Sequence, residues 1–230
     1  MLFKLATRPS ITKTIEIGAY EAGFSKKVKA ARPDIAALAF EANPYVYDHF
    51  KDDVLGGDVD YRHFCVNSTG DDTNIRIPMD FRGSERELTN QMSSILSNGS
   101  TTNTKEVLVP GFCFDNEFEV NEDDEFVLWV DVEGASENVL PGCKKILEKC
   151  SAVFIEVESK PIWEGQWLDT DINKFFVENG FYPALRDFQS PGQYNVIYLN
   201  TKYKLNMPVL RQFWTMIDQT GLLQGHASAA

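Results

Sequence analysis

The sequence predicts an α/β fold, a doubly wound sheet of about seven strands that is mostly parallel and ends in an antiparallel hairpin. Three observations support this prediction. Strand and helix patterns alternate along the chain, which is typical of parallel strands joined by crossover helices. Some strand patterns, such as residues 126–130, are continuous apolar runs, as expected when helices cover both faces of a sheet. The last two strand patterns are separated only by residues 189–193, a joint short enough for antiparallel pairing.

Serine and proline residues mark the limits of the elements in the first half of the chain. The predicted strands are, in chain order, residues 14–17, 35–40, 61–66, 75–77, 107–109, 126–130, 152–155, 181–188 and 194–199. After the first strand, Ser25 is a suitable N-cap for a helix that ends at Arg32, because Pro33 disfavours helical geometry in the residue before it. After the second strand, Pro44 opens the next helix at the first helical position, where proline is favoured.

The second half of the chain continues this alternation. Apolar residues repeat at helical spacing across 139–150, and Pro141 either begins or bends that helix. Gly180 closes a further helix over residues 171–179. A final amphipathic helix is expected at 209–217, followed by a frayed tail.

The length of the chain predicts one domain over residues 1–230. Within it, we expect residues 81–124 to be a variable insertion, whose polar run at 97–104 is a mobile loop. Residues 201–230 are expected to form a C-terminal helix and tail.

The charge balance argues against several classes of partner. Lys and Arg number 22 against 34 Asp and Glu, so the formal net charge is −12, which disfavours nucleic acid and membrane surfaces. No apolar run reaches the roughly 18 residues that a membrane helix needs. The N-terminal segment does not resemble a secretory signal, so we expect a cytoplasmic protein with free thiols. No metal site is predicted, and the cysteines, which lack C-x-x-C spacing, are expected to be small buried hydrophobes: Cys65, Cys113, Cys143 and Cys150.

A glycine-containing turn and an acid form the candidate cofactor site. Gly18 and Gly23 follow the first strand and let the backbone approach a ligand closely, but the pattern is not G-x-G-x-x-G. Glu41 ends the second strand 23 residues after Gly18, close to the spacing of roughly 20 residues at which an acid binds ribose hydroxyls in doubly wound folds. Because the turn lacks the glycines of a pyrophosphate site, a nucleoside without phosphates fits better. S-adenosylmethionine is such a cofactor.

Acids at the ends of two later strands are the candidate catalytic residues. Asp131 and Glu133 follow a buried strand and share one face if the strand geometry continues. They could orient a substrate hydroxyl, accept its proton or bind the amino group of the cofactor, or they could be a charged turn before a helix that begins at Ser136. Glu156 and Glu158 alternate on the next strand, near an end that faces either a cleft or solvent.

Three blocks of the sequence carry a resemblance to a known family. They are residues 15–25 (IEIGAYEAGFS), 39–44 (AFEANP) and 130–142 (VDVEGASENVLPG), and residues 195–199 also match. The chain resembles the FkbM-type family of S-adenosylmethionine-dependent methyltransferases over roughly residues 14–200, with a poor match in the insertion. The resemblance implies a class I methyltransferase (Rossmann-like) fold with a seven-stranded sheet whose seventh strand is antiparallel.

The resemblance also implies roles for single residues. The turn at Gly18 would hold the methionine part of the cofactor and Glu41 the ribose, while Asn67 and Ser68 would lie near the adenine and Asp131 would face the methyl group. The full set of expected cofactor-binding residues is Glu16, Gly18, Ala19, Tyr20, Gly23, Ser25, Glu41, Ala42, Asn43, Asn67, Ser68 and Asp131. The expected catalytic residues are Asp131, Glu133 and Glu156.

Three residues depart from the pattern of the family. Ser136, in the turn after Ala135, stands where Glu is usual. Glu16 stands where Asp is usual, and its extra methylene shifts its reach to the amino group of the cofactor. Tyr20 stands where Asn is usual and places a ring beside the cofactor turn. These departures keep open an alternative function, a non-catalytic cofactor-binding or interaction module with the same fold.

The predicted function is O-methylation of a hydroxyl on a small or carbohydrate-like acceptor, with Asp131 or Glu133 removing the hydroxyl proton. The insertion and the segment around Trp163 and Trp167 would line the acceptor pocket. A nicotinamide-dependent oxidoreductase is less favoured, because it predicts a third glycine in the first turn and no terminal antiparallel hairpin. The sequence leaves the oligomeric state open.

Overall fold

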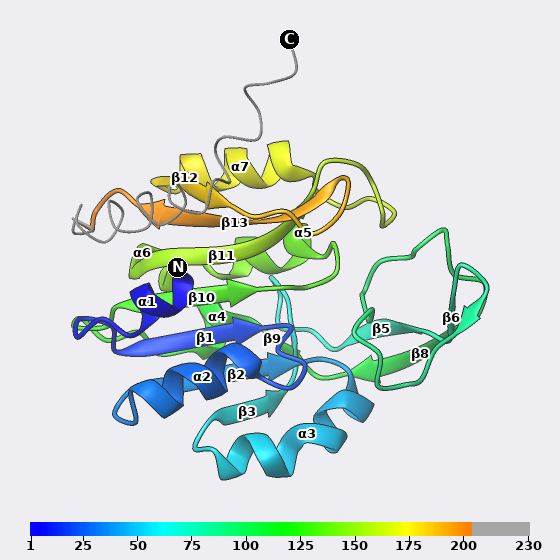
Figure 1. Cartoon of the computed structure of the whole chain (residues 1–230), viewed down its shortest axis with the longest axis horizontal. Helices are drawn as coiled ribbons and strands as arrows, with labels where there is room; N and C mark the ends of the chain where they lie inside the picture. The colour runs from blue at the N-terminus through cyan, green and yellow to red at the C-terminus, as the bar shows by residue number, and fades with distance from the viewer. Residues whose placement is uncertain (204–230) are drawn as a thin grey trace, which may run out of the picture.

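One seven-stranded sheet organises the computed structural model, which describes residues 1–203. Its strands are, in spatial order, β12 (Phe181–Arg186), β13 (Gln193–Asn200), β11 (Cys150–Glu158), β10 (Phe126–Val130), β1 (Lys13–Ile17), β2 (Ala36–Glu41) and β3 (Asp60–His63) (Figure 1). β13 runs antiparallel to both of its neighbours, and the other six strands are parallel. This is the sheet that the sequence predicts, with the reversed strand that the resemblance implies.

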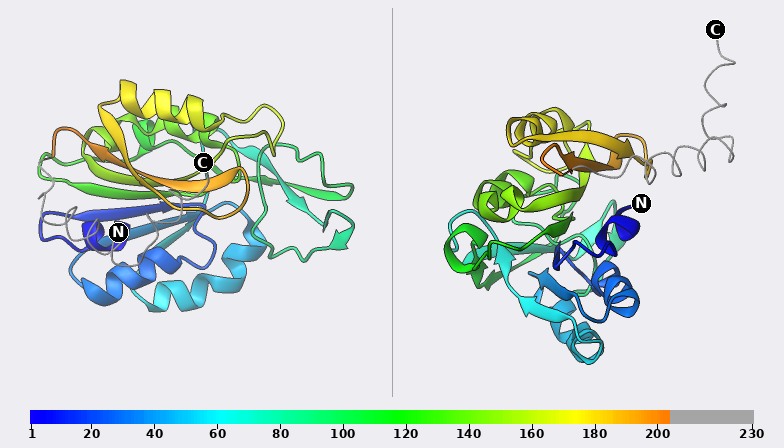
Figure 2. Two further views of the ribbon diagram at one scale, coloured as in Figure 1. Left: turned by 45° about the horizontal axis from the view of Figure 1, so that its top comes forward. Right: turned by 90° about the vertical axis from the view of Figure 1, so that its left-hand side faces the viewer.

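Helices cover both faces of the sheet (Figure 2). One face carries α1 (Leu2–Ala6), α2 (Gly23–Ala31) and α3 (Pro44–Gly56). The opposite face carries α4 (Phe114–Glu117), α5 (Ser136–Val139), α6 (Lys144–Glu148) and α7 (Asp169–Glu178). Successive residues of β10 therefore serve different cores: Val127 packs toward α1 and α2, and Leu128 packs toward α4 to α7.

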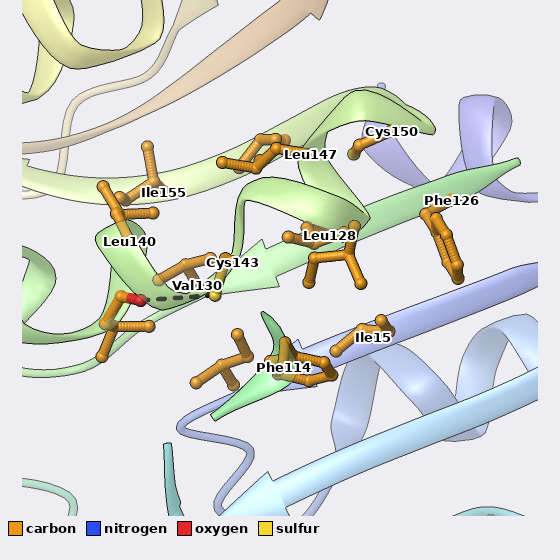
Figure 3. Packing of buried hydrophobic residues seen from close by; sticks show 14 of the residues in the cluster. Ile15, Phe114, Phe126, Leu128, Val130, Leu140, Cys143, Leu147, Cys150 and Ile155 are labelled. Carbon is orange, nitrogen blue, oxygen red and sulfur yellow. Dashed lines mark hydrogen bonds between the residues drawn. The ribbon is translucent and has the colours of Figure 1, made fainter. Parts of the chain in front are cut away.

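The larger core lies between the sheet and α4 to α7 (Figure 3). Ile15, Leu128 and Ile155 come from neighbouring strands, and all three are fully buried. Burying one such side chain contributes about 1.5–3 kcal/mol. This packing fixes the strands relative to one another, and therefore fixes the edge at which they end.

The helix predicted over residues 139–150 is broken into α5, a 3₁₀ turn (η1, Leu140–Gly142) and α6. Pro141 lies inside the 3₁₀ turn, because proline has no N–H to continue a helical ladder. Cys143 is buried after the turn, and its thiol donates to the carbonyl of Val139 at 3.3 Å (Figure 3). All four cysteines are buried and free, which confirms that prediction.

α2 begins at Gly23, two residues before the predicted N-cap Ser25. Ser25 is instead buried in the first turn of the helix. The backbone N–H groups of Phe24 and Ser25 donate to the carboxylate of Glu16 on β1. An acid from the preceding strand therefore takes the place of a local cap.

The predicted third strand, residues 61–66, is two strands. β3 belongs to the main sheet, and β4 (Cys65–Val66) pairs in parallel with β9 (Gly111–Phe112). Between them, the N–H of Phe64 donates to the carbonyl of Glu41 at 3.2 Å. The chain leaves the sheet at that point, beside the end of β2.

A β-arm, residues 73–109, extends away from the sheet (Figure 1). In it β5 (Thr73–Pro78) pairs antiparallel with β8 (Thr104–Val109), and β6 (Asp80–Phe81) pairs with β7 (Ser84–Glu85). The chain is back in the core at Phe114, which is fully buried, so the excursion starts and ends earlier than the expected insertion, 81–124. Hydrogen bonds fix part of the polar run 97–104, because backbone N–H groups of this run donate to the carboxylate of Asp80.

The helix predicted at 209–217 and most of the segment 201–230 lie outside the described residues. Among the helices of residues 1–203, none has both the length and the apolar character that crossing a membrane requires.

The backbones of β1 and β10 meet closely where the two strands end. Gly18 has a φ of +75°, and a Cβ added to it would lie 1.6 Å from the carbonyl oxygen of Asp131. The N–H of Asp131 donates to the carbonyl of Ile17 at 2.9 Å, and the N–H of Gly18 donates to the carbonyl of Phe40 at 3.0 Å. Glycine is therefore required at position 18 by both its φ and the space available.

Gly18→Ala should destabilise the protein far more than Gly165→Ala. Both glycines have a φ of +75°, but a Cβ at Gly165 meets no atom within 4 Å. We expect a loss of roughly 1 kcal/mol for Gly165→Ala, and of at least about 3 kcal/mol or a failure to fold for Gly18→Ala, measured by urea denaturation. Equal losses for the two variants would contradict the close contact at Gly18.

Candidate functional site

A cavity of about 520 Å³ opens at the carboxyl ends of the parallel strands. This volume is within the range of roughly 300–1,000 Å³ that small-molecule sites occupy. The ends of β1, β2, β10 and β11 and the turns that follow them form much of its wall, and residues between 90 and 95 of the β-arm close one side. Doubly wound folds bind their ligands at this edge of the sheet.

Glu41 organises the part of the cavity beside β2. Its carboxylate accepts the backbone N–H of Tyr20 at 2.8 Å and that of Asn43 at 2.7 Å. Tyr20 has a left-handed φ of 49°, and the hydroxyl of Tyr61 donates to its carbonyl. Burial raises the pKa of Glu41 above its ordinary value. An ionised carboxylate can accept about four hydrogen bonds, so Glu41 keeps acceptor capacity for a ligand.

Glu16 lines the cavity and also holds the N-terminus of α2. Its carboxylate accepts the N–H of Ser25 at 2.8 Å and that of Phe24 at 3.3 Å. A negative charge at a helix N-terminus is favoured by the helix dipole. Burial nevertheless raises the pKa of Glu16 to about 7. The side chain is therefore already engaged with the protein backbone, as well as facing the cavity.

Asp131, Glu133 and Glu156 form a carboxylate cluster at the ends of β10 and β11. One carboxylate oxygen of each residue lies within 4.8 Å of the others. β10 ends at Val130, Glu133 has a φ of 49°, and Gly134 has a φ of 80°. A turn, rather than continued strand geometry, therefore brings Glu133 beside Asp131.

Burial and mutual repulsion weaken the acidity of the carboxylate cluster. Burial, followed by the charge of Glu158, raises the pKa of Asp131 to about 6. Burial and the charge of Asp131 raise the pKa of Glu156 to about 7 and that of Glu133 well above its ordinary value. Burial and the charge of Glu156 raise the pKa of Glu158 to about 7. Acids with such shifts, gathered in a cleft, are typical of functional sites.

The cavity also has an apolar side. Apolar residues from α3, β4 and the β-arm that line it are Val46, Cys65, Val66, Ile75 and Ile95, and we call this set the apolar slot. Ile75 and Ile95 come from the β-arm, so the arm builds part of the wall.

Hydrogen bonds attach the β-arm to both sides of the cavity. On one side, the amide of Asn43 donates to the carbonyl of Leu88 at 2.8 Å and to the hydroxyl of Ser93 at 2.9 Å. On the other side, the hydroxyl of Ser94 donates to the carbonyl of Glu133 at 2.7 Å. The arm therefore contacts the acid-bearing turn directly. Ser93 and Ser94 belong to the insertion that the sequence analysis expected beside the acceptor pocket, but their partners are not visible in the sequence.

The structure brings most of the predicted site residues to the cavity. Those that line it are Glu16, Gly18, Ala19, Tyr20, Gly23, Glu41, Ala42, Asp131, Glu133 and Glu156. Four others, Ser25, Asn43, Asn67 and Ser68, do not. Ser25 lies in the first turn of α2, and Asn43 caps α3. The side chain of Asn67 accepts the N–H of Gly70 at 2.7 Å and donates to the carbonyl of Asp71 at 2.9 Å, so it stabilises its own turn.

The predicted tryptophans do not line the cavity, whereas one that was not singled out does. Trp163 is 2% exposed and packs so closely on Gly134 that a Cβ there would lie 2.4 Å from its ring. Trp167 packs against α7. Trp129 is half-buried and borders the cavity. Its position on β10, two residues before Asp131 and on the same face, is the signal that could have identified it.

A comparison with models of protein families identifies the family of the chain. A model of the methyltransferase FkbM domain matches residues 16–183. The chain belongs to this family. The match includes the glycine turn, Glu41 and the carboxylate cluster, and the sheet with its reversed β13 is the class I methyltransferase fold. A search of curated protein sequences finds no match to this FkbM domain.

Solved structures similar to this FkbM domain include other methyltransferases. Precorrin-6y C5,15-methyltransferase from Geobacter metallireducens GS-15 has 11% identity and a TM-score of 0.46, with 86% of this chain and 84% of that chain covered. Magnesium protoporphyrin IX methyltransferase from Synechocystis PCC 6803, with bound SAM, has 8% identity and a TM-score of 0.46, with 86% and 74% covered. TrmK of M. capricolum, in complex with S-adenosyl-homocysteine, has 10% identity and a TM-score of 0.45, with 91% and 73% covered.

The raised pKa of Glu16 predicts how the free energy of unfolding depends on pH. Because burial raises this pKa from 4.5 to about 7, the folded protein binds the proton more tightly than the unfolded chain does. The free energy of unfolding should therefore fall as the pH rises from about 5 to about 8, and the fall should be shallower in Glu16→Gln. Thermal melts across this range test it, with the exposed Glu178→Gln as a control that keeps the parent slope. Identical slopes for the parent and Glu16→Gln would contradict it.

Proposed function

We propose that this FkbM domain is an S-adenosylmethionine-dependent methyltransferase that acts on a hydroxyl group of a small or carbohydrate-like acceptor. The observation that carries the proposal is the convergence of Glu41, the turn at Gly18 and the carboxylate cluster on one cavity. They supply an acceptor for ribose hydroxyls, a backbone that a ligand can approach closely and groups that can accept a proton.

The polar and apolar parts of the cavity suit a nucleoside. Glu41 would accept hydrogen bonds from the ribose hydroxyls, because its carboxylate keeps acceptor capacity beyond the N–H groups of Tyr20 and Asn43. The apolar slot around Cys65 would hold the adenine ring. The turn at Gly18 would hold the methionine part.

The charge of the cavity favours S-adenosylmethionine over a nicotinamide dinucleotide. Glu16, Glu41 and the carboxylate cluster place acids on the part of the cavity wall that the strand ends form. Acids attract a positively charged sulfonium and repel a pyrophosphate. The turn 18–23 also lacks the G-x-G-x-x-G pattern that a pyrophosphate needs.

The carboxylates of the cluster would act on the hydroxyl group of the acceptor. When bound, S-adenosylmethionine supplies a methyl group on a positively charged sulfur, and S-adenosylhomocysteine remains once the acceptor oxygen holds that methyl group. The acceptor hydroxyl loses its proton, and Asp131 at the end of β10 would accept it. Help of this kind typically accelerates a reaction by about 10²–10⁴-fold, while alignment of the reactants can contribute roughly 7–11 kcal/mol.

Calorimetric titration with S-adenosylhomocysteine, with NADH in parallel, tests the class of cofactor. We expect S-adenosylhomocysteine to bind and NADH to show no heat of binding. Transfer of a labelled methyl group from S-adenosylmethionine to a panel of sugars and small alcohols then tests the reaction. Binding of NADH alone would point to an oxidoreductase, and binding of S-adenosylhomocysteine without any transfer would point to a non-catalytic module.

Glu41→Ala should weaken the binding of S-adenosylhomocysteine by about 10–100-fold, because it removes charge-assisted hydrogen bonds that are worth about 1.5–3 kcal/mol each. The calorimetric Kd measures the effect, and a thermal melt shows whether the variant is folded. Glu178→Ala, an exposed acid on α7, is the matched control and should bind as the parent does. A folded Glu41→Ala variant with the Kd of the parent would remove Glu41 from the site.

A further inference from the structure

A second pocket adjoins the cavity at the strand ends. It has a volume of about 330 Å³ and is lined by residues of α1, α2, β10, β11, β12 and β13. Phe24, Lys27 and Trp129 line both this pocket and the larger cavity, so the two spaces are neighbours. We call it the aromatic pocket, after the rings of Phe24, Trp129 and Phe154 in its wall. Its size and its mainly apolar lining are those of a small-molecule site.

The sheet provides the floor of the aromatic pocket and leads from it to the carboxylate cluster. Trp129 on β10 pairs in register with Phe154 on β11, and Phe154 pairs with Ile197 on β13. Because side chains alternate along a strand, Glu156 lies on the same face as Phe154, about 7 Å farther along β11. Asp131 likewise follows Trp129 by two residues. A ligand on this floor can therefore reach the cluster with one end.

The aromatic pocket offers a ring few neutral hydrogen-bonding groups. The rings of Phe24 and Phe154 both stack on the indole of Trp129, with centroids 5.4 and 3.9 Å away. The carboxylate of Asp187 accepts the backbone N–H of Asn195 at 2.8 Å and its side-chain amide N–H at 3.0 Å, so these two polar groups bind each other. A sugar ring carries hydroxyl groups on most of its carbons, and each loses hydrogen bonds to water when it is buried. The pocket therefore favours an aromatic ring over a sugar ring.

Two exposed cations, Lys27 and Arg186, line the aromatic pocket. Neither of them forms an ion pair among residues 1–203. The guanidinium of Arg186 lies over the ring of Tyr194, 4.4 Å from its centroid, and a guanidinium can bind a carboxylate with two N–H groups. The wall of the larger cavity carries acids instead. This arrangement favours a ligand whose negative group stays in the pocket and whose neutral hydroxyl reaches the cluster.

We propose that the aromatic pocket binds the acceptor of the methyl group, and that this acceptor is an aromatic carboxylic acid with a hydroxyl group on its ring. The inference rests on the proposed function and narrows its class of acceptor. The ring lies against Trp129 and Phe154, the carboxylate binds Lys27 and Arg186, and the hydroxyl points to the carboxylate cluster. In the transfer, the hydroxyl oxygen forms a bond to the methyl carbon, the carbon–sulfur bond breaks with its electrons going to sulfur, and the hydroxyl proton goes to a carboxylate of the cluster.

Calorimetric titration of the full chain with three probes, para-hydroxybenzoate, para-hydroxyphenylacetate and para-hydroxycinnamate, tests the proposal. The titrations are done with and without S-adenosylhomocysteine. We expect at least one of these acids to bind, and its uncharged amide to bind at least about tenfold more weakly. The double variant Lys27→Gln/Arg186→Gln should weaken binding of the acid at least about tenfold and leave binding of the amide unchanged, because only the acid loses charge-assisted hydrogen bonds. Phe154→Leu should weaken binding of the acid and the amide alike, by about 2–10-fold, because it removes an aromatic contact.

Lys144→Gln/Lys174→Gln is the matched control, since it removes two exposed cations from α6 and α7 on the opposite face of the sheet and should bind the acid as the parent does. Thermal melts identify the variants that fold. Absence of binding of all three acids would overturn the proposal, whether another part of the chain or a second copy then covers the pocket. A folded Lys27→Gln/Arg186→Gln variant with the Kd of the parent would overturn it too, as would tighter binding of glucuronate, a sugar acid.

Titration of the same samples with S-adenosylhomocysteine alone separates the two proposals. Binding of S-adenosylhomocysteine without binding of any aromatic acid rejects the acceptor pocket and leaves the proposed function standing. Binding of an acid that the double variant weakens, in a chain that does not bind S-adenosylhomocysteine, supports the pocket as a binding site and rejects the proposed function.

Discussion

The contact between the backbones of Gly18 and Asp131 is the constraint on which the site depends. Because position 18 has no side chain, the end of β1 can lie directly against the end of β10, and hydrogen bonds from Asp131 to Ile17 and from Gly18 to Phe40 fix three strand ends together. The path of the backbone therefore places three features around one cavity: the glycine turn, Glu41 on β2 and the carboxylate cluster. Groups positioned in this way need little reorganisation when a ligand arrives.

The acids of the cavity divide into two kinds according to their partners. Glu16 and Glu41 accept backbone N–H groups, so they hold α2 and the glycine turn in place even without a ligand. The carboxylate cluster, in contrast, has charges that the protein brings together and does not pair among residues 1–203. The first kind preserves the shape of the cavity, and the second kind supplies groups that can react with a ligand.

The sheet, its strand ends and the acids at those ends could be predicted from the sequence, because apolar runs and turn residues are local signals. Ser25 and Asn67 could not be placed, since what they do depends on partners that local patterns do not specify. Glu16 takes the capping role that the sequence suggested for Ser25, and Asn67 bonds its own turn. The bond from Ser94 to Glu133 joins residues 39 positions apart, and the packing of Trp163 on Gly134 is likewise a tertiary contact that local propensity does not encode.

The β-arm contributes walls to the cavity, but it contributes no strand to the seven-stranded sheet. Its buried residues Ile75, Ile77 and Val109 pack with Cys65 of β4, and hydrogen bonds at Asn43 and Ser94 add to this attachment, while the larger core of the domain lies elsewhere. Mutations at exposed positions of the arm, such as Leu108, can therefore accumulate with little effect on folding. A lineage that carries this domain could change the molecules it recognises by insertion, deletion or recombination within one short stretch of its gene, while the rest of the protein stays under purifying selection.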